Sequence, residues 1–338
     1  MRFSPACNSF AASYLIRQTS STAREFQFCT KHLSAARQLH TTMQKQKENE
    51  CSIFSNLYVS EGRDEQFINE LHEMAHNKTG ETFDCALVNK FSDPHYNRTS
   101  FCFAGHYSSV SRIIKEVAEV AIESLNLEEH EASHPRIGVV DHISVHPLGE
   151  TMVFAEEAAR EIGAYFGTEK GIPILFYGSL NGKRLSAVRR STSYFRGGQD
   201  REVAADLGPR AVDPRRGAMC VGAVPPVLNY NVRFRCTDRK AVGAIARALR
   251  EKDGGLPGVE AVALRHAGGN YEAACNLLEA DRVGPEEVLA AATAAAAAQG
   301  GIEVDAAYTI GLTAAEVADR LARALAGRCS GGGDGGGR

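Results

Sequence analysis

The segment His134-Pro135-Arg136, followed by Gly138 and Asp141, contains the residues best suited to acid–base chemistry. An unperturbed imidazole has a pKa of about 6.5, so it exchanges protons near neutral pH, and a carboxylate such as Asp141 would raise that pKa. Proline disfavours helical backbone angles at the residue before it, so we expect His134 to lie exposed at the entrance to a strand. The alternative interpretation is a hydrogen-bonded structural histidine.

A polar turn at residues 93–98 joins two strand-like runs and therefore lies at one end of a sheet, where ligands are commonly held. Arg98 can bind a carboxylate through two parallel hydrogen bonds, and Asn97 can donate to an amide or a pterin ring. This chemistry suits an amino-acid derivative or a folate. A turn that carries a solvated arginine explains the same residues equally well.

Two later segments each allow two interpretations. Residues 182–201 are rich in arginine and lysine, which either attract an anionic ligand or belong to a mobile loop. Gly222 and Ala223 lead into the strand that holds Asn231, and such small residues indicate backbone that closely approaches either a ligand or a neighbouring element.

Alternating strand-like and helical patterns position these residues. In the first half of the chain, the patterns predict strands at 51–59, 83–91, 99–104, 137–145 and 172–177, and helices around 67–74, 110–121 and 151–166. In the second half they predict strands at 227–234, 259–265, 273–278 and 302–308, and helices at 238–252 and from Pro285 to the glycines at 300–301. Thr313 and Glu316 form a capping box that opens a last helix.

The order strand–helix–strand–strand–helix–strand thus occurs twice. It predicts an α+β fold of two ferredoxin-like (βαββαβ) subdomains with mixed sheets, helices on the outer faces and a ligand cleft between them. The expected domains are a targeting or disordered segment at 1–44, an N-terminal subdomain at 50–218, a C-terminal subdomain at 219–327 and a disordered glycine-rich tail at 328–338.

Composition excludes several classes of function. The formal charge of -3, without a long basic stripe, argues against nucleic-acid binding, and no run is apolar enough to cross a membrane. The nine cysteines show neither a CxxC pair nor zinc-ligand spacing, and we interpret them as reduced thiols. His142 and His146 alternate along a predicted strand without further ligands, so no metal site is expected.

The first 44 residues are rich in serine, threonine, alanine and arginine, and Glu25 is their single acid. This composition is typical of an organelle transit peptide, so we expect a mitochondrial protein, with a plastid as the alternative. A start at Met43 would make the protein cytoplasmic. A merely disordered extension is a further interpretation.

Several motifs together resemble the N-terminal subdomain of formiminotransferase. They are Ser60-Glu61-Gly62, Asn97-Arg98-Thr99, His134-Pro135-Arg136-Ile137-Gly138 with Asp141, and Tyr177-Gly178. The His-Pro-Arg-x-Gly-x-x-Asp pattern is the most specific of them. The similarity continues through Asp206-Leu-Gly-Pro209 and Tyr230-Asn231 to Gly311-Leu312, and so covers roughly residues 55–325.

The resemblance implies a glutamate formimidoyltransferase-like enzyme without the cyclodeaminase domain of the bifunctional animal enzyme. Such an enzyme moves a formimino (or formyl) group between N-formimino-L-glutamate and the co-substrate tetrahydrofolate, with His134 as general acid and base. Folate and glutamate-derived small molecules are then its partners, and we expect a homodimer. The positions expected to bind ligand are Asn97, Arg98, Arg136, Gly138, Asp141, Tyr177, Gly178, Gly222, Ala223 and Asn231.

The chain departs from the family pattern in three places. Val224 stands where an arginine is expected, Arg233 replaces the second asparagine of Asn-x-Asn, and Ile143-Ser144 replaces an apolar–proline step. These changes fall on positions that we expect to face folate or substrate. They motivate an alternative function, a catalytically inactive folate-binding protein.

Overall fold

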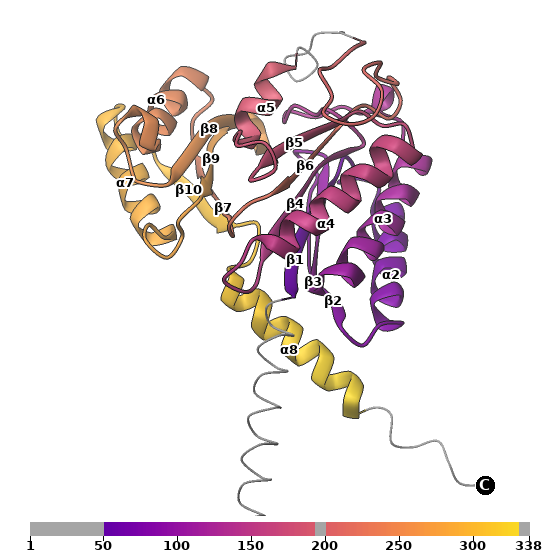
Figure 1. The fold of residues 1–338 in the computed structure, drawn as a ribbon. Helices are drawn as coiled ribbons and strands as arrows, with labels where there is room; N and C mark the ends of the chain where they lie inside the picture. The colour runs from indigo at the N-terminus through magenta and orange to yellow at the C-terminus, as the bar shows by residue number, and fades with distance from the viewer. Residues whose placement is uncertain (1–50, 193–200, 331–338) are drawn as a thin grey trace, which may run out of the picture. The chain divides into compact units, whose positions relative to one another are not determined.

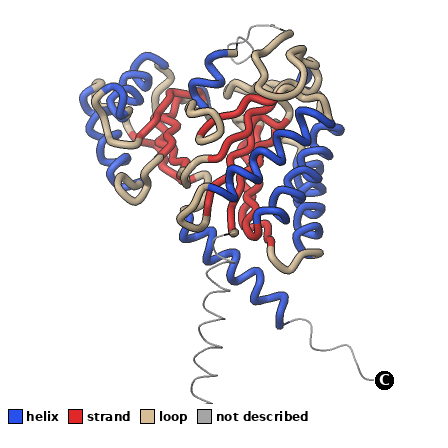
Figure 2. The backbone as a smooth tube through the Cα atoms, viewed as in Figure 1, coloured by secondary structure: helices blue, strands red, loops and turns tan. Residues whose placement is uncertain are grey.

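The structure is a computed structural model that describes residues 51–192 and 201–330, with the side chains of all but the last two. The predicted targeting segment therefore lies outside the described residues, as do residues 193–200 of the basic stretch and 331–338 of the tail. Two β-sheets with their helices make up the described part (Figure 2). The α+β class is confirmed.

The first sheet has six strands in the order β2-β3-β1-β4-β6-β5 (Figure 1). Its elements are β1 (Ser52–Val59), α2 (Glu65–Gly80), β2 (Cys85–Asp93), β3 (Arg98–His106), α3 (Tyr107–Ser124), β4 (Val140–Pro147), α4 (Val153–Ala164), β5 (Ile174–Gly178), α5 (Leu185–Ser191) and β6 (Met219–Ala223). Strands β1 to β4 pair antiparallel, whereas β6 runs parallel to both β4 and β5. This sheet is mixed, as predicted.

The second sheet has four strands in the order β10-β7-β9-β8, and all its pairs are antiparallel. Its elements are β7 (Leu228–Phe234), α6 (Arg239–Leu249), β8 (Val259–Arg265), β9 (Tyr271–Leu277), α7 (Pro285–Ala298) and β10 (Val304–Thr309). The prediction of a mixed sheet is wrong here. Each helix joins two strands of the same direction, but an antiparallel strand lies between them, so no parallel pair forms.

Some predicted boundaries differ from the structure. The polar stretch contains the short helix α5, and the glycine-rich segment after it contains β6, which carries the first sheet through Ala223, past the predicted boundary at 218. Strand β4 begins at Val140 rather than at 137. Helix α8 (Ala314–Ser330) extends into the segment predicted as a disordered tail, and its capping box is present because Glu316 accepts from the backbone amide of Thr313.

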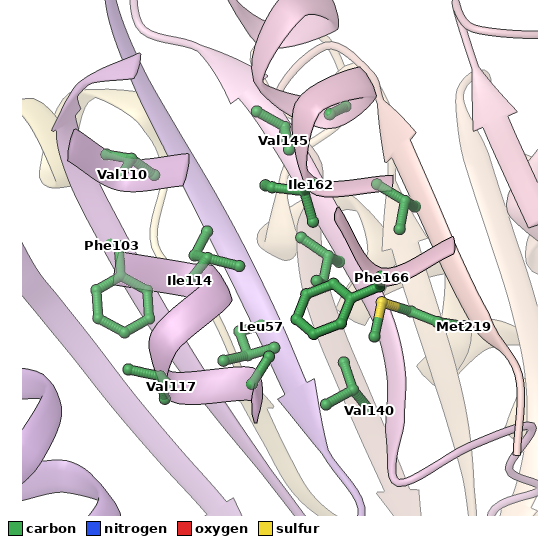
Figure 3. Packing of buried hydrophobic residues seen from close by; sticks show 14 of the residues in the cluster. Leu57, Phe103, Val110, Ile114, Val117, Val140, Val145, Ile162, Phe166 and Met219 are labelled. Atoms are coloured by element: carbon green, nitrogen blue, oxygen red, sulfur yellow. The ribbon is translucent and has the colours of Figure 1, made fainter. Parts of the chain in front are cut away.

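The core of the first unit lies between its sheet and helices α2, α3 and α4. Apolar residues at helical spacing on α3, among them Ile114 and Val117, pack against Leu57 of β1 and Phe103 of β3 (Figure 3). Each such fully buried side chain contributes about 1.5–3 kcal/mol to folding. The opposite face is also covered, because Val317 and Leu321 of α8 pack on Phe54 and its neighbours. Both faces of this sheet are therefore buried.

The second unit buries only one face of its sheet under helices, where α6 and α7 cover an apolar core (Figure 1). The other face carries alternate residues of β7 and β9, including Asn229, Asn231 and Glu272. Two of these residues bond to the first unit: Tyr58 donates to Asn229 at 3.0 Å and Tyr96 donates to Glu272 at 2.5 Å. The polar face of the second sheet therefore meets the first unit.

Within the described part of the chain, no helix is both long and apolar enough to cross a membrane. The free cysteines there are Cys51, Cys85, Cys102, Cys220, Cys236 and Cys275.

Candidate functional site

His134 lies in the loop that leads to β4, and its side chain is half-buried rather than exposed. Its Nδ1 atom is 2.8 Å from the carbonyl oxygen of Pro135 and 2.5 Å from Nη1 of Arg136. The ring of Tyr96 stands edge-on to the imidazole, with 5.5 Å between ring centroids. Neighbours on both sides therefore fix the orientation of the imidazole.

The pKa of His134 is lowered well below the ordinary value of about 6.5, which corrects the expectation that Asp141 would raise it. Burial is the largest cause, and the guanidinium groups of Arg98, Arg136 and Arg189 act in the same direction. Asp141 does favour the protonated form, but these four effects outweigh it. His134 is thus neutral at pH 7 and able to accept a proton.

Asp141 is fully buried and anchors the loop that carries His134. Its Oδ1 atom accepts from the backbone amide of Ile137 at 3.1 Å, and its Oδ2 atom is paired with Arg189 of α5. Although burial raises the pKa of Asp141, Arg189 and the other basic groups around it hold that pKa well below its usual range. Residues 185–191, for which a mobile loop was one of two interpretations, form helix α5, and this helix supplies a buried counter-ion.

The other two arginines near His134 have different roles. Arg136 is buried and donates to the backbone carbonyls of Tyr96 at 2.6 Å and of His134 at 3.2 Å. Burial and the nearby Arg98 lower the pKa of Arg136 to about 9. Arg98 is half-buried and lies over the ring of Tyr58, 5.0 Å from its centroid, and no described carboxylate pairs with it. Of these three arginines, Arg98 is therefore the one whose guanidinium is left for an anionic ligand.

Asn97 holds the turn that presents Arg98. It has a positive φ of 47°, its side-chain oxygen accepts from the amide of Gly62 at 2.8 Å, and its Nδ2 lies 3.3 Å from both Nδ1 of His130 and the carbonyl of Glu131. Both polar groups of the side chain are thus engaged within the fold. The contact of Asn97 with a ligand stays a prediction.

The predicted small residues lie where backbone and rings pack closely. A Cβ atom on Gly222 would lie 2.5 Å from the ring of Tyr177, and one on Gly178 would lie 2.2 Å from the carbonyl oxygen of Ala223. At Gly138 the same addition would meet the carbonyl oxygen of Ala218 at 2.1 Å. These contacts favour the interpretation that the glycines allow close packing within the first sheet.

Asn231 belongs to a second cluster, around Glu272 on the inner face of the second sheet. Glu272 is fully buried and accepts from three neutral groups, Asn231 at 2.5 Å, Tyr96 at 2.5 Å and Tyr308 at 2.9 Å. Next to it, His266 lies 3.1 Å from Asp93 of the first unit. Sequence reasoning missed Tyr96, Glu272 and His266. One signal was present, because a glutamate inside the mostly apolar strand β9 requires buried partners.

A cavity of about 690 Å³ opens between loops of the two units. It is lined by Arg63, Pro94, His95, Glu131, Ala132 and Ser133 of the first unit and by Arg265, His266 and Gly269 of the second. Its volume is typical of small-molecule sites, and Ser133 on its wall directly precedes His134. No cluster of three or more potential metal ligands occurs in the described ranges.

The residues that depart from the family pattern have partners of their own. Arg233 forms an ion pair with Asp305 of the neighbouring strand at 2.7 Å. Ser144 lies 2.9 Å from Nε2 of His146, whose pKa burial lowers to about 4. Val224 packs against an apolar cluster that includes Tyr177.

Comparison with known proteins adds an independent observation. Residues 52–224 match the family described as formiminotransferase domain, N-terminal subdomain. The chain is 37% identical to a formiminotransferase cyclodeaminase-like protein of Arabidopsis thaliana, over 60% of this chain and 75% of that protein. It is 29% identical to a glutamate formimidoyltransferase of Thermoplasma acidophilum, over 60% of this chain and 69% of the relative. A formimidoyltransferase-cyclodeaminase of Sus scrofa is also 29% identical, over 58% of this chain but 37% of that longer protein.

Proposed function

Because the chain belongs to the formiminotransferase family and is therefore a transferase, we propose that it moves a formimino group from N-formimino-L-glutamate to tetrahydrofolate, with His134 as general acid and base. The observation that carries the proposal is the neutral imidazole of His134, fixed by Arg136 and Tyr96 in the loop beside the cavity. The proposal extends to a formyl group, because the same chemistry would transfer it.

The chemistry needs one proton to move twice. N5 of tetrahydrofolate attacks the formimino carbon, a carbon–nitrogen bond forms, and His134 accepts the proton that N5 releases. His134 then returns that proton to the glutamate nitrogen as its bond to the same carbon breaks and the tetrahedral intermediate collapses. Such acid–base help typically increases a rate about 10²–10⁴-fold.

Arg98 is proposed to bind a carboxylate of the glutamate-derived substrate. Its guanidinium lies over the ring of Tyr58 and contributes to the lowered pKa of His134, so the two side chains are close. A bidentate arginine–carboxylate pair would fix the substrate beside the imidazole. We propose that tetrahydrofolate binds as co-substrate in the cleft between the two units and that no metal takes part in the reaction.

The test is a titration of tetrahydrofolate into the full chain by calorimetry, followed by addition of N-formimino-L-glutamate while the 5-formimino product is monitored. We expect binding, turnover, and loss of turnover in His134→Ala. The control is His76→Ala, which removes an exposed histidine of α2 and should retain wild-type turnover. Wild-type turnover in His134→Ala would overturn the proposed role of His134.

A second candidate function is a catalytically inactive folate-binding protein. The observation that favours it is the loss of the expected arginine at Val224, since Arg233 is paired with Asp305 and does not replace it. Binding of tetrahydrofolate without turnover, unchanged in His134→Ala, would support this function over transfer.

Three further proposals rest on less direct observations. The strand orders of both sheets contain the 2-3-1-4 pattern of a ferredoxin-like βαββαβ unit, which supports that name for each unit.

A homodimer is proposed, and its test is the molecular mass of the protein in solution, which should be twice that of one chain. Mitochondrial targeting by residues 1–44, with a plastid or a cytoplasmic start at Met43 as alternatives, is testable by fusing that segment to a fluorescent protein.

A further inference from the structure

We infer that Glu272 and Tyr96 are positioning residues for His134: the buried carboxylate of the second unit holds the tyrosine ring against which the imidazole of the first unit lies. The inference rests on the proposed function only where turnover is its readout. Its core concerns the geometry of the loop that carries His134. The orientation of His134, a residue of the first unit, then depends on the second unit.

Tyr96 has three separate links, and each joins a different group. Its hydroxyl donates to Glu272 at 2.5 Å, across 176 residues of sequence. Its backbone carbonyl accepts from Arg136, the residue two places after His134, at 2.6 Å. Its ring, which is only 1% exposed, stands edge-on to the imidazole of His134. A shift of the hydroxyl would therefore displace both contacts that reach the histidine loop.

Glu272 is a rigid anchor for this purpose. Its Oε1 atom accepts from both Asn231 and Tyr96, whereas its Oε2 atom accepts from Tyr308. Asn231 of the same sheet therefore holds the oxygen that the hydroxyl of Tyr96 meets, and Tyr308 bonds to the other oxygen. The position of Tyr96 is thus set through β7 and β9.

A second contact between the units fixes the other end of the same turn. Asp93 accepts from the backbone amides of His95 at 2.8 Å and Tyr96 at 3.0 Å, and its other oxygen meets His266 at 3.1 Å. The ring of His266 also stands edge-on to that of Tyr96 at 5.1 Å. The turn before Arg98 is therefore held by the second unit at both Asp93 and Tyr96.

The experiment compares two tyrosines that donate to the same carboxylate. Tyr96→Phe and Tyr308→Phe each remove one hydroxyl from Glu272, but only Tyr96 also contacts the histidine loop. In the full chain, we expect Tyr96→Phe to lower kcat about 10–100-fold with little change in KM, since a misplacement of about 1 Å can cost about 10²-fold. Tyr308→Phe should keep at least about half of the wild-type kcat.

A readout that does not need turnover separates this inference from the proposed function. The titration of His134 can be followed by NMR of histidine-labelled protein, with the signal assigned through its loss in His134→Asn. We expect Tyr96→Phe to raise the pKa of His134 toward about 6.5, because a looser loop admits water beside the imidazole. In Tyr308→Phe the pKa should stay where it is in the wild type.

Equal changes in both variants, or no change in Tyr96→Phe, would overturn the inference. If the wild type shows no turnover, the proposed function fails, and the NMR comparison alone decides the inference. Should either variant fail to fold, Glu272→Met, which keeps a side chain of similar length but removes both acceptor oxygens, must reproduce the shift in the His134 titration.

Discussion

The two units bury charge in opposite ways. Around His134 the first unit gathers Arg98, Arg136 and Arg189 with one close carboxylate, Asp141, so positive charge is in excess. The second unit buries the single carboxylate of Glu272 among neutral donors. The first arrangement holds an imidazole neutral, whereas the second fixes geometry through hydrogen bonds.

This difference shows what each buried carboxylate contributes. Asp141 offsets a buried guanidinium and ties down the amide of Ile137, so its removal takes the carboxylate away from that buried charge. Glu272 offsets no such cation directly and instead orders three donors around it.

Arg189→Met should lower the free energy of unfolding by about 3–5 kcal/mol, because it leaves the carboxylate of Asp141 buried without its counter-ion. Denaturant unfolding measures the loss. The double variant Arg189→Met with Asp141→Asn should recover most of it, since asparagine keeps an acceptor for Ile137 but carries no charge. Failure of the double variant to recover would contradict the ion-pair explanation.

Glu272→Gln should cost less, about 1–3 kcal/mol, because the donors around it are neutral and its amide oxygen can still accept from one or two of them. The same unfolding experiment applies. A loss as large as that of Arg189→Met would mean that Glu272 also compensates a buried cation, and the contrast between the units would not hold.

The two histidines predict pH effects of opposite sign. His134 has a folded-state pKa below the unfolded value of about 6.5, so the unfolded state binds protons more readily and stability falls as the pH drops below about 6.5. For His266, burial lowers the pKa, but the bond to Asp93 and the charge of Glu272 outweigh it and raise that pKa. Its contribution is fully present below about 6.5 and is lost as the pH rises through the raised value.

Unfolding free energies of wild type, His134→Gln and His266→Gln between pH 5 and 8 measure these effects. The advantage of wild type over His266→Gln should shrink as the pH rises above about 6.5. Relative to His134→Gln, the wild type should instead lose unfolding free energy as the pH falls. Parallel curves for all three proteins would contradict both assignments.

Periodicity predicted most elements of the fold because long apolar patterns dominate them, as in α3 and β1. It missed α5 and β6, since α5 has only seven residues with two arginines and β6 has five that include a glycine. The capping box at Thr313 was readable because it depends on residues three apart. The order of the strands in each sheet depends on contacts between segments that are distant in sequence. The spacing of residues along the chain does not encode those contacts.

The sequence offered His134 as a candidate through its His-Pro-Arg motif, and its role stays a prediction. The predicted direction of its pKa shift was wrong because that shift depends first on burial and then on arginines that include Arg98 and Arg189, which are distant in sequence. Tyr96 and Glu272 were missed for the same reason. Their link joins residues 176 positions apart, and the one local signal, a glutamate inside strand β9, does not say which residue is its partner.

The most direct test of the account is the pH dependence of kcat/KM for formimino transfer in wild type and His134→Asn. If burial and the arginines hold His134 neutral, the wild-type kcat/KM should stay level as the pH falls through about 6.5 and decline only well below that value. The His134→Asn variant should show only trace turnover. An acid limb at or above about 6.5, or wild-type turnover in His134→Asn, would contradict it.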